Sequence, residues 1–148
     1  LPYRAMRSKG SIYQGGVNVP MIISGSGVNR MGEREAALIH TTDLFATIAE
    51  ISGVSIEEIN NSKSFYNLLS DSTASKREFV YTERSNNGVS YAIRNSIYKL
   101  IVHENGNQEF YNLLDDPYEI NDLIDTALSS DALSAKSDLE IEANIIRM

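Results

Sequence analysis

The sequence contains no cysteine. Disulfides, thiolate nucleophiles and cysteine-based metal sites are therefore excluded. Long apolar runs are absent as well, because the longest, Val19–Ile23, has the length of a strand and not of a membrane span. The first residues lack the apolar core of a signal peptide, and the chain opens with Leu1 in place of methionine. We expect a processed product or a fragment of a longer protein, with no membrane as its partner.

Clustered positive charge is also missing. The 148 residues include 13 Lys and Arg against 20 Asp and Glu, and the resulting net charge of −7 is spread along the chain. Binding to nucleic-acid phosphates needs clustered cations, so we expect no nucleic-acid partner. The hydrophobic share of 42% is that of a globular protein, and the length suits one domain, or one small domain with a piece of a larger one.

Histidine is scarce, and no local pattern of metal ligands is present. His40 and His103 lie far apart without neighbouring ligands, which argues against a zinc site. The acidic stretch Asp115–Asp122 lacks the spacing and the central glycine of a calcium loop. There is no nucleophile elbow, phosphate-binding loop or dinucleotide fingerprint. Without a family in view, these residues identify no catalytic group.

The N-terminal half has the pattern of an α/β domain. Its apolar run ahead of Gly25 predicts a strand covered on both faces. A helix follows, capped by Thr41 or Thr42, with an apolar face that includes Leu44, Phe45, Ile48 and Ile51. In chain order we expect a glycine-rich loop over 9–16, a strand over 19–24, a helix over 43–51, a helical turn over 64–69 and a polar boundary over 70–76.

The C-terminal half changes to short segments rich in Tyr, Phe, Ile and Val, separated by turn residues such as Asn105-Gly106-Asn107. This spacing predicts an antiparallel meander with strands over 78–83, 89–94, 97–103 and 108–113. Asp116-Pro117-Tyr118-Glu119 has the layout of a helix start. A last helix over 133–146 should cover one face of the sheet. The expected fold is α/β, with a piece of a catalytic domain over 1–75 and an α+β subdomain over 76–148.

One segment carries a more specific pattern. Residues 9–23 read Lys-Gly-Ser-Ile-Tyr-Gln-Gly-Gly-Val-Asn-Val-Pro-Met-Ile-Ile, which resembles the sulfatase stretch Lys-Gly-Thr-x-Tyr-Glu-Gly-Gly-x-Arg-Val-Pro followed by apolar residues. Three further segments resemble the family in the same order: the helix at 41–48, the Tyr-Lys-Leu-Ile strand at 98–101, and the strand and turn at 109–119. The similarity covers nearly the whole chain. It predicts the C-terminal portion of an arylsulfatase-like enzyme of the alkaline-phosphatase-like superfamily.

The resemblance implies a chemistry that is mostly located elsewhere. Sulfatases hydrolyse sulfate esters with a formylglycine and a divalent cation, usually calcium, and both belong upstream of this chain in a missing N-terminal catalytic half. No metal ligand carries over. Lys9 alone carries over, as the lysine that contacts the sulfate ester substrate, and the isolated chain is expected to be inactive. The loop that supports it consists of Gly10, Gln14, Gly15, Gly16 and Asn18.

Two residues depart from the family pattern. Gln14 stands where the family has Glu, and Asn18 stands where it has Arg. Since both charges are lost together, a neutral amide pair replacing a salt bridge would avoid an unpaired buried charge. We therefore expect the two side chains to share a hydrogen bond or a partner.

Other interpretations stay open at this level. Lys9 can be a surface lysine ahead of a strand. The parent protein can be a phosphodiesterase or phosphonate monoester hydrolase of the same superfamily, or the chain a non-catalytic interaction module. The apolar strand predicted at 19–24 needs neighbouring strands, so we also expect the isolated chain to self-associate through it.

Overall fold

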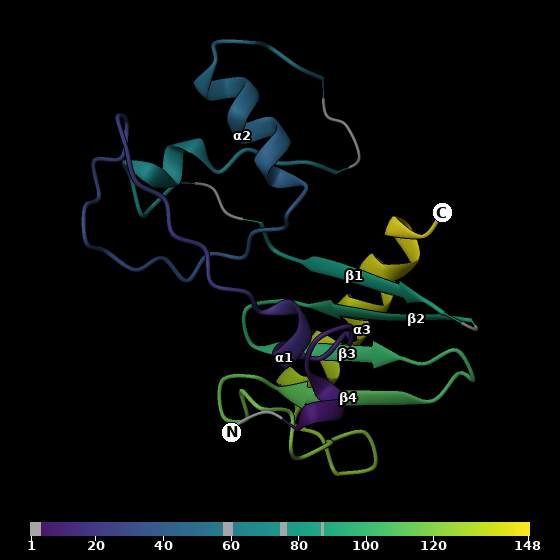
Figure 1. Ribbon diagram of the computed structural model, residues 1–148. Helices are drawn as coiled ribbons and strands as arrows, with labels where there is room; N and C mark the ends of the chain where they lie inside the picture. Colours follow the sequence, from purple (N-terminus) through teal and green to yellow (C-terminus); the bar gives the residue numbers. More distant parts are fainter. Residues whose placement is uncertain (1–3, 58–60, 75–76, 87) are drawn as a thin grey trace. The chain divides into compact units, whose positions relative to one another are not determined.

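The computed structural model describes residues 4–57, 61–74, 77–86 and 88–148. The chain forms two compact units (Figure 1). The sheet unit comprises the described residues of Leu1–Pro20 together with Phe79–Met148, and the middle unit comprises those of Met21–Glu78. No helix in the described part of the chain is long and apolar enough to cross a membrane.

A four-stranded antiparallel meander forms the centre of the sheet unit. Its strands are β1 (Val80–Ser85), β2 (Val89–Arg94), β3 (Tyr98–Val102) and β4 (Gln108–Asn112), and they pair in sequence order. The turn between β3 and β4 contains Gly106 at a φ of 85°, a conformation that glycine adopts without cost. The predicted meander is confirmed, with strand ends within two residues of those expected.

Alternation along the strands gives the sheet two buried faces. One face carries Tyr91, Ile93, Leu100 and Phe110, and it packs against α3 (Ser130–Ile146). The opposite face carries mainly Ala92, Ile101, Tyr111 and Leu113, and Ile12 of the N-terminal segment packs on it. Figure 1 shows α3 behind the sheet and the N-terminal segment in front. Lys99 precedes Leu100 and Glu109 precedes Phe110, so by strand alternation both side chains lie on the second face, with Ile101 and Tyr111.

Helix α3 confirms the predicted C-terminal helix and begins three residues earlier than expected. Its N-cap is Ser129, whose side chain accepts a hydrogen bond from the Ala132 backbone N–H at 3.3 Å. Leu139 and Ala143 are fully buried against the sheet. The predicted helix start at residues 116–119 is wrong, because this stretch forms a turn in which Glu119 has a φ of 57°.

The N-terminal segment of the sheet unit contains two short helices. The 3-10 helix η1 spans Ala5–Arg7 and the helix α1 spans Gln14–Val17, so the expected loop over 9–16 ends in a helical turn. The predicted strand over 19–24 is wrong, since these residues form no strand and Ile22 is 93% exposed. A strand of that kind needs hydrogen-bonded neighbours, and none of the described residues provides one.

The middle unit contains α2 (Asp43–Ile51) and the 3-10 helix η2 (Tyr66–Leu69), as the sequence predicts. Thr42 is the N-cap of α2 without a side-chain cap hydrogen bond. Leu44, Phe45, Ile48 and Ile51, the predicted apolar face of α2, are exposed. The helix is instead fixed by buried polar groups, because Thr47 Oγ1 donates to the Asp43 carbonyl at 2.7 Å and accepts from the Phe65 N–H at 3.1 Å.

The expected domain boundary at residues 75 and 76 lies outside the described residues. Phe79, close to it, begins the second part of the sheet unit. The structure adds that the described residues up to Pro20, including Lys9, belong with the sheet and not with the middle unit. The division of the parent protein into domains stays a prediction.

Candidate functional site

Lys9 lies in the turn between η1 and α1, at the surface of the sheet unit. Its side chain is exposed, and its ammonium forms no hydrogen bond or ion pair with any residue that the structure describes. The turn is closed by the Ser11 N–H, which donates to the Ser8 carbonyl at 3.0 Å. Gly10 follows Lys9 at a φ of 80°, in the left-handed region that favours glycine. The lysine is thus presented to solvent by a tight turn.

Gly16 allows helix α1 to lie directly against this turn. A Cβ atom at position 16 would lie 2.4 Å from the Ser11 carbonyl oxygen and 2.6 Å from that of Ser8. No side chain fits at such a distance, so the close approach of the two segments requires glycine here. The sequence placed Gly10 and Gly16 in the loop that supports Lys9, and the structure gives a geometric reason for a glycine at each position.

Both ends of the Lys9 turn are bound to one residue, Glu119. After the turn, the Gln14 backbone N–H donates to Glu119 Oε2 at 2.6 Å. Before the turn, Arg7 Nη1 donates to the Glu119 backbone carbonyl. Glu119 is 1% exposed, although it lies 105 residues from Gln14 in the sequence.

Glu119 is in turn paired with Lys99 on strand β3. Lys99 Nζ lies 2.6 Å from Glu119 Oε1, and Lys99 is also 1% exposed. Burial lowers the pKa of Lys99 to about 8, and the charge of the neighbouring carboxylate offsets this effect only in part. The two buried charges satisfy each other, which is how a charged pair can remain inside a protein.

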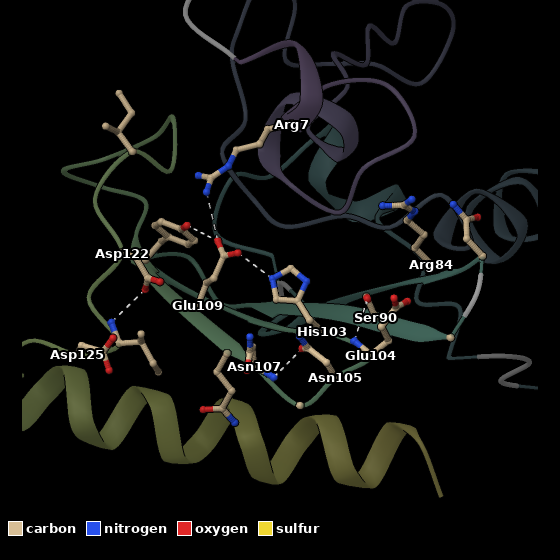
Figure 2. A pocket seen from close by; sticks show the side chains of 17 residues that line it. Arg7, Arg84, Ser90, His103, Glu104, Asn105, Asn107, Glu109, Asp122 and Asp125 are labelled. Carbon is tan, nitrogen blue, oxygen red and sulfur yellow. Dashed lines mark hydrogen bonds and ion pairs between the residues drawn. The ribbon is translucent and has the colours of Figure 1, made fainter.

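A second cluster surrounds Glu109 on strand β4 (Figure 2). The carboxylate accepts from the Tyr13 hydroxyl at 2.6 Å, contacts His103 Nε2 at 2.7 Å and accepts from the Tyr111 hydroxyl. Arg7 Nη2 lies 3.5 Å away, and the Arg7 guanidinium covers the Tyr13 ring at 4.3 Å. Burial alone would raise the pKa of Glu109, but these hydrogen bonds outweigh it and lower the pKa.

An open groove of about 1010 Å³ lies beside this cluster in the sheet unit. Figure 2 shows Arg7, Arg84, His103, Glu109 and Asp122 among its lining side chains. Lys9 does not line it. Within residues 4–57, 61–74, 77–86 and 88–148, no three His, Asp or Glu side chains gather in a way that could hold a metal ion.

The expected amide pair of Gln14 and Asn18 is wrong. Gln14 is 5% exposed whereas Asn18 is exposed, and no hydrogen bond joins their side chains in the part of the chain that the structure describes. They are linked only through the helix backbone, since the Asn18 N–H donates to the Gln14 carbonyl at 2.9 Å. Gly15 lies between them within α1 and is half-buried.

The sequence did not identify Glu119 and Glu109 as site residues. Lys99 stood out only as part of the Tyr-Lys-Leu-Ile match. A usable signal existed in that match, because a lysine flanked by apolar residues in a central strand needs a buried acidic partner. The sequence offered no means of choosing that partner among 20 acidic residues.

The family model for the C-terminal part of N-sulphoglucosamine sulphohydrolase matches residues 5–143. The chain belongs to this family. A protein named Sulfatase from Formosa agariphila is 23% identical over 112 residues, which are 76% of this chain and 22% of that relative. The predicted relationship to the C-terminal portion of sulfatases is therefore confirmed.

Solved structures of sulfatase type share the fold. A 2-O GAG sulfatase superposes with a TM-score of 0.71 at 20% identity, covering 84% of this chain and 28% of its own. A protein solved with D-glucosamine-2-N,6-O-disulfate, described there as its substrate, gives a TM-score of 0.62 at 21% identity and covers 71% and 24%. This chain spans about a quarter of the length of these relatives.

Proposed function

We propose that this chain is the C-terminal part of a sulfatase, a sulfuric ester hydrolase, and that Lys9 contacts the sulfate group of its substrate. The observation that carries the proposal is the exposure of the Lys9 side chain within the region that matches the family. Its side chain is exposed and has no partner among the residues that the structure describes, on a turn whose two ends are held by Glu119. A cation held in this way is available to an anionic group that approaches the turn.

The chemistry of sulfate ester hydrolysis gives such a cation a role. Negative charge develops on the bridging oxygen as the S–O bond breaks, so a nearby ammonium stabilises the transition state more than the ground state. Lysine provides a compact point charge for this purpose. Because the turn is fixed before substrate binds, little reorganisation is needed at the moment of reaction.

The remaining chemistry belongs outside this chain in our proposal. A formylglycine would supply the nucleophile and a divalent cation such as calcium would supply further charge stabilisation. The described residues offer no cluster suited to such a cation, so no step is assigned to it here. The isolated chain should therefore be inactive toward an aryl sulfate in the presence of calcium, with turnover no higher than that of a heat-treated sample.

Sulfated sugars are the substrate class to test first. One similar structure is a 2-O GAG sulfatase, and another was solved with a disulfated glucosamine. The intact protein should release sulfate from such sugars faster than it hydrolyses an aryl phosphate diester. The reverse preference would favour a phosphodiesterase or phosphonate monoester hydrolase of the same superfamily.

Substitution of Lys9 in the intact protein tests its proposed role. Lys9→Ala should lower kcat by about 100- to 1000-fold, the usual effect of losing one stabilising group in a closed site. Lys9→Arg should also be impaired, because the guanidinium is larger and directs its donors differently. Lys136→Ala, which removes a lysine from α3 on the other face of the sheet, is the matched control.

The thermal melt of each variant separates an effect on chemistry from one on folding. The Lys9 side chain is exposed and forms no hydrogen bond or ion pair within the described part of the chain, so Lys9→Ala should melt like the wild type. Unchanged kcat and kcat/KM in Lys9→Ala would return this residue to the role of a surface lysine.

A further inference from the structure

We propose that Glu119, held in place by Lys99, is a positioning residue that fixes the turn carrying Lys9. The proposal rests on the sulfate-contacting role proposed for Lys9. Neither Glu119 nor Lys99 touches the sulfate in this proposal. They act through the Gln14 backbone on one side of Lys9 and through the Arg7 side chain on the other.

The contacts of Glu119 bracket Lys9 in the sequence. Arg7 is bound to the Glu119 carbonyl and the Gln14 N–H to the Glu119 carboxylate. Since the turn between Arg7 and Gln14 is short, fixing both of its ends on one residue restricts the place that Lys9 can occupy. None of the residues described by the structure binds the Lys9 side chain, so its location depends on these anchors.

Glu119 has little freedom to move. Oε1 is bound to Lys99 and Oε2 to Gln14, each at 2.6 Å, so rotation of the carboxylate would break both contacts. Its backbone has a φ of 57°, a conformation that a residue with a side chain keeps only where its surroundings impose it. The side chain is buried, so water does not compete for either oxygen.

Lys99 connects this arrangement to the rigid part of the unit. It lies on β3, one of the two inner strands, and is paired with Arg94 on one side and Tyr111 on the other. The register of the sheet therefore sets the position of its backbone, and the contact with Glu119 holds its ammonium. A structural path runs from the sheet through Lys99 and Glu119 to the backbone beside Lys9.

Glu119→Gln tests the inference with almost no change in shape. Lys99 Nζ and the Gln14 N–H use different oxygens of Glu119. In the amide one of these two positions becomes an NH2 donor, so one of the two contacts loses its acceptor in this geometry. The double variant Lys99→Met/Glu119→Gln removes the competing cation, and the amide oxygen can then serve Gln14. Glu140→Gln, the same chemical change at an ion pair on α3, is the control.

Two measurements on the intact protein are expected to agree. In Glu119→Gln, kcat should fall by about 10- to 100-fold with a smaller change in KM, the scale typical of a misplaced catalytic group. Amide exchange at Gln14 should become faster at the same time. The double variant should recover slow exchange at Gln14 and most of kcat, and Glu140→Gln should match the wild type in both.

Combination with Lys9→Ala separates positioning from a general effect on the fold. If Glu119 acts through Lys9, adding Glu119→Gln to Lys9→Ala should lower kcat by less than about twofold further, because residues that act through one another are not additive. A full additional loss of activity would overturn the inference, as would normal kcat and slow Gln14 exchange in Glu119→Gln.

Failure of the proposed function gives a different result. If Lys9→Ala alone leaves turnover unchanged, the sulfate-contacting role is overturned, and with it the catalytic consequence of the anchors. Amide exchange at Gln14 can be measured without any turnover. A comparison of Glu119→Gln with the wild type then decides whether Glu119 fixes the turn. Should Glu119→Gln fail to fold, Lys99→Met/Glu119→Met carries the test, because it leaves no unpaired charge at this pair and offers the Gln14 N–H no acceptor. Slow exchange at Gln14 and normal kcat in that variant would overturn the inference.

Discussion

Arg77 and Asp43 form a two-point contact within the middle unit. Arg77 Nε lies 3.0 Å from Asp43 Oδ2, while Nη2 contacts Oδ1. The same carboxylate accepts the backbone N–H of His40 at 2.7 Å and that of Lys63 at 2.9 Å. Asp43 is 1% exposed. One carboxylate therefore joins the start of α2 to two segments that are distant in the sequence.

This relationship predicts a loss of stability in acid. Burial would raise the pKa of Asp43, but the hydrogen bonds from Arg77, Lys63 and His40 outweigh it and lower the pKa. A folded-state pKa below the unfolded value of about 3.9 means that the stabilisation is present above that value and is lost as pH falls through the folded pKa. Thermal melts between neutral pH and about pH 2 should show this loss.

Asp43→Asn should remove the same stabilisation at neutral pH. Breaking a buried ion pair by changing one partner typically costs about 3–5 kcal/mol. The variant should also lose most of the acid dependence of the wild type, as followed by denaturant unfolding. Asp71→Asn, an exposed carboxylate of the same unit, is the control and should shift unfolding much less. Equal effects of the two substitutions would contradict the prediction.

Gly16→Ala should disturb the turn that presents Lys9. The new methyl group would lie within 2.6 Å of two backbone carbonyl oxygens, and backbone cannot move aside as a flexible side chain can. We expect a loss of about 1–3 kcal/mol in the free energy of unfolding. Gly10→Ala meets no atom within 4 Å and should cost only the left-handed conformation, about 1–2 kcal/mol. Amide exchange at Gln14 should become faster in Gly16→Ala and stay unchanged in Gly10→Ala. This difference would distinguish a displaced turn from a strained conformation at one residue.

The contact between α3 and the sheet should depend on Leu139. This residue is fully buried, and Leu139→Ala should lower the free energy of unfolding by about 2–5 kcal/mol. Leu133 on the same helix is 55% exposed, so Leu133→Ala should cost less than about 1 kcal/mol. Denaturant titrations of both variants give the comparison. Similar losses would mean that α3 packs with a different face.

Self-association of the isolated chain through residues 19–24 stays a prediction. Val19 is 75% exposed and Ile22 is 93% exposed, a degree of apolar exposure that favours contact with other surfaces. Sedimentation velocity at rising concentration should show association that Ile22→Lys reduces. Ile141→Lys, at an exposed position of α3, should leave it unchanged. A monomer at all concentrations would refute the prediction.

The sheet and its helix could be predicted because their determinants are local. Each hairpin of the meander joins strands that are adjacent in the sequence, with turn residues such as Asn105-Gly106 between them. The start of α3 depends on Ser129, within one turn of the helix. Patterns that a short window of sequence contains are sufficient for such elements.

The remaining features depend on partners that the local pattern does not contain. Asp116-Pro117-Tyr118-Glu119 satisfies the rules for a helix start, yet Glu119 is drawn into a left-handed turn by contacts with Lys99 and Gln14. The apolar run at 19–24 has the composition of a strand but pairs with no described neighbour. Tertiary contacts overrode local propensity at Glu119, whereas residues 19–24 lack the neighbouring strand that their propensity would need.

The separation between Gln14 and Glu119 also has a consequence for biosynthesis. The two residues are 105 positions apart, so at about 5–20 residues per second the ribosome needs roughly 5–20 s to make the second after the first. The hairpins of the meander can close as each one emerges, because their strands are consecutive. The segment with Lys9 is made first in the sheet unit and cannot form its contact with Glu119 until that residue has been made. Until those strands have been made, Ile12 lacks the sheet face on which it packs in the finished fold.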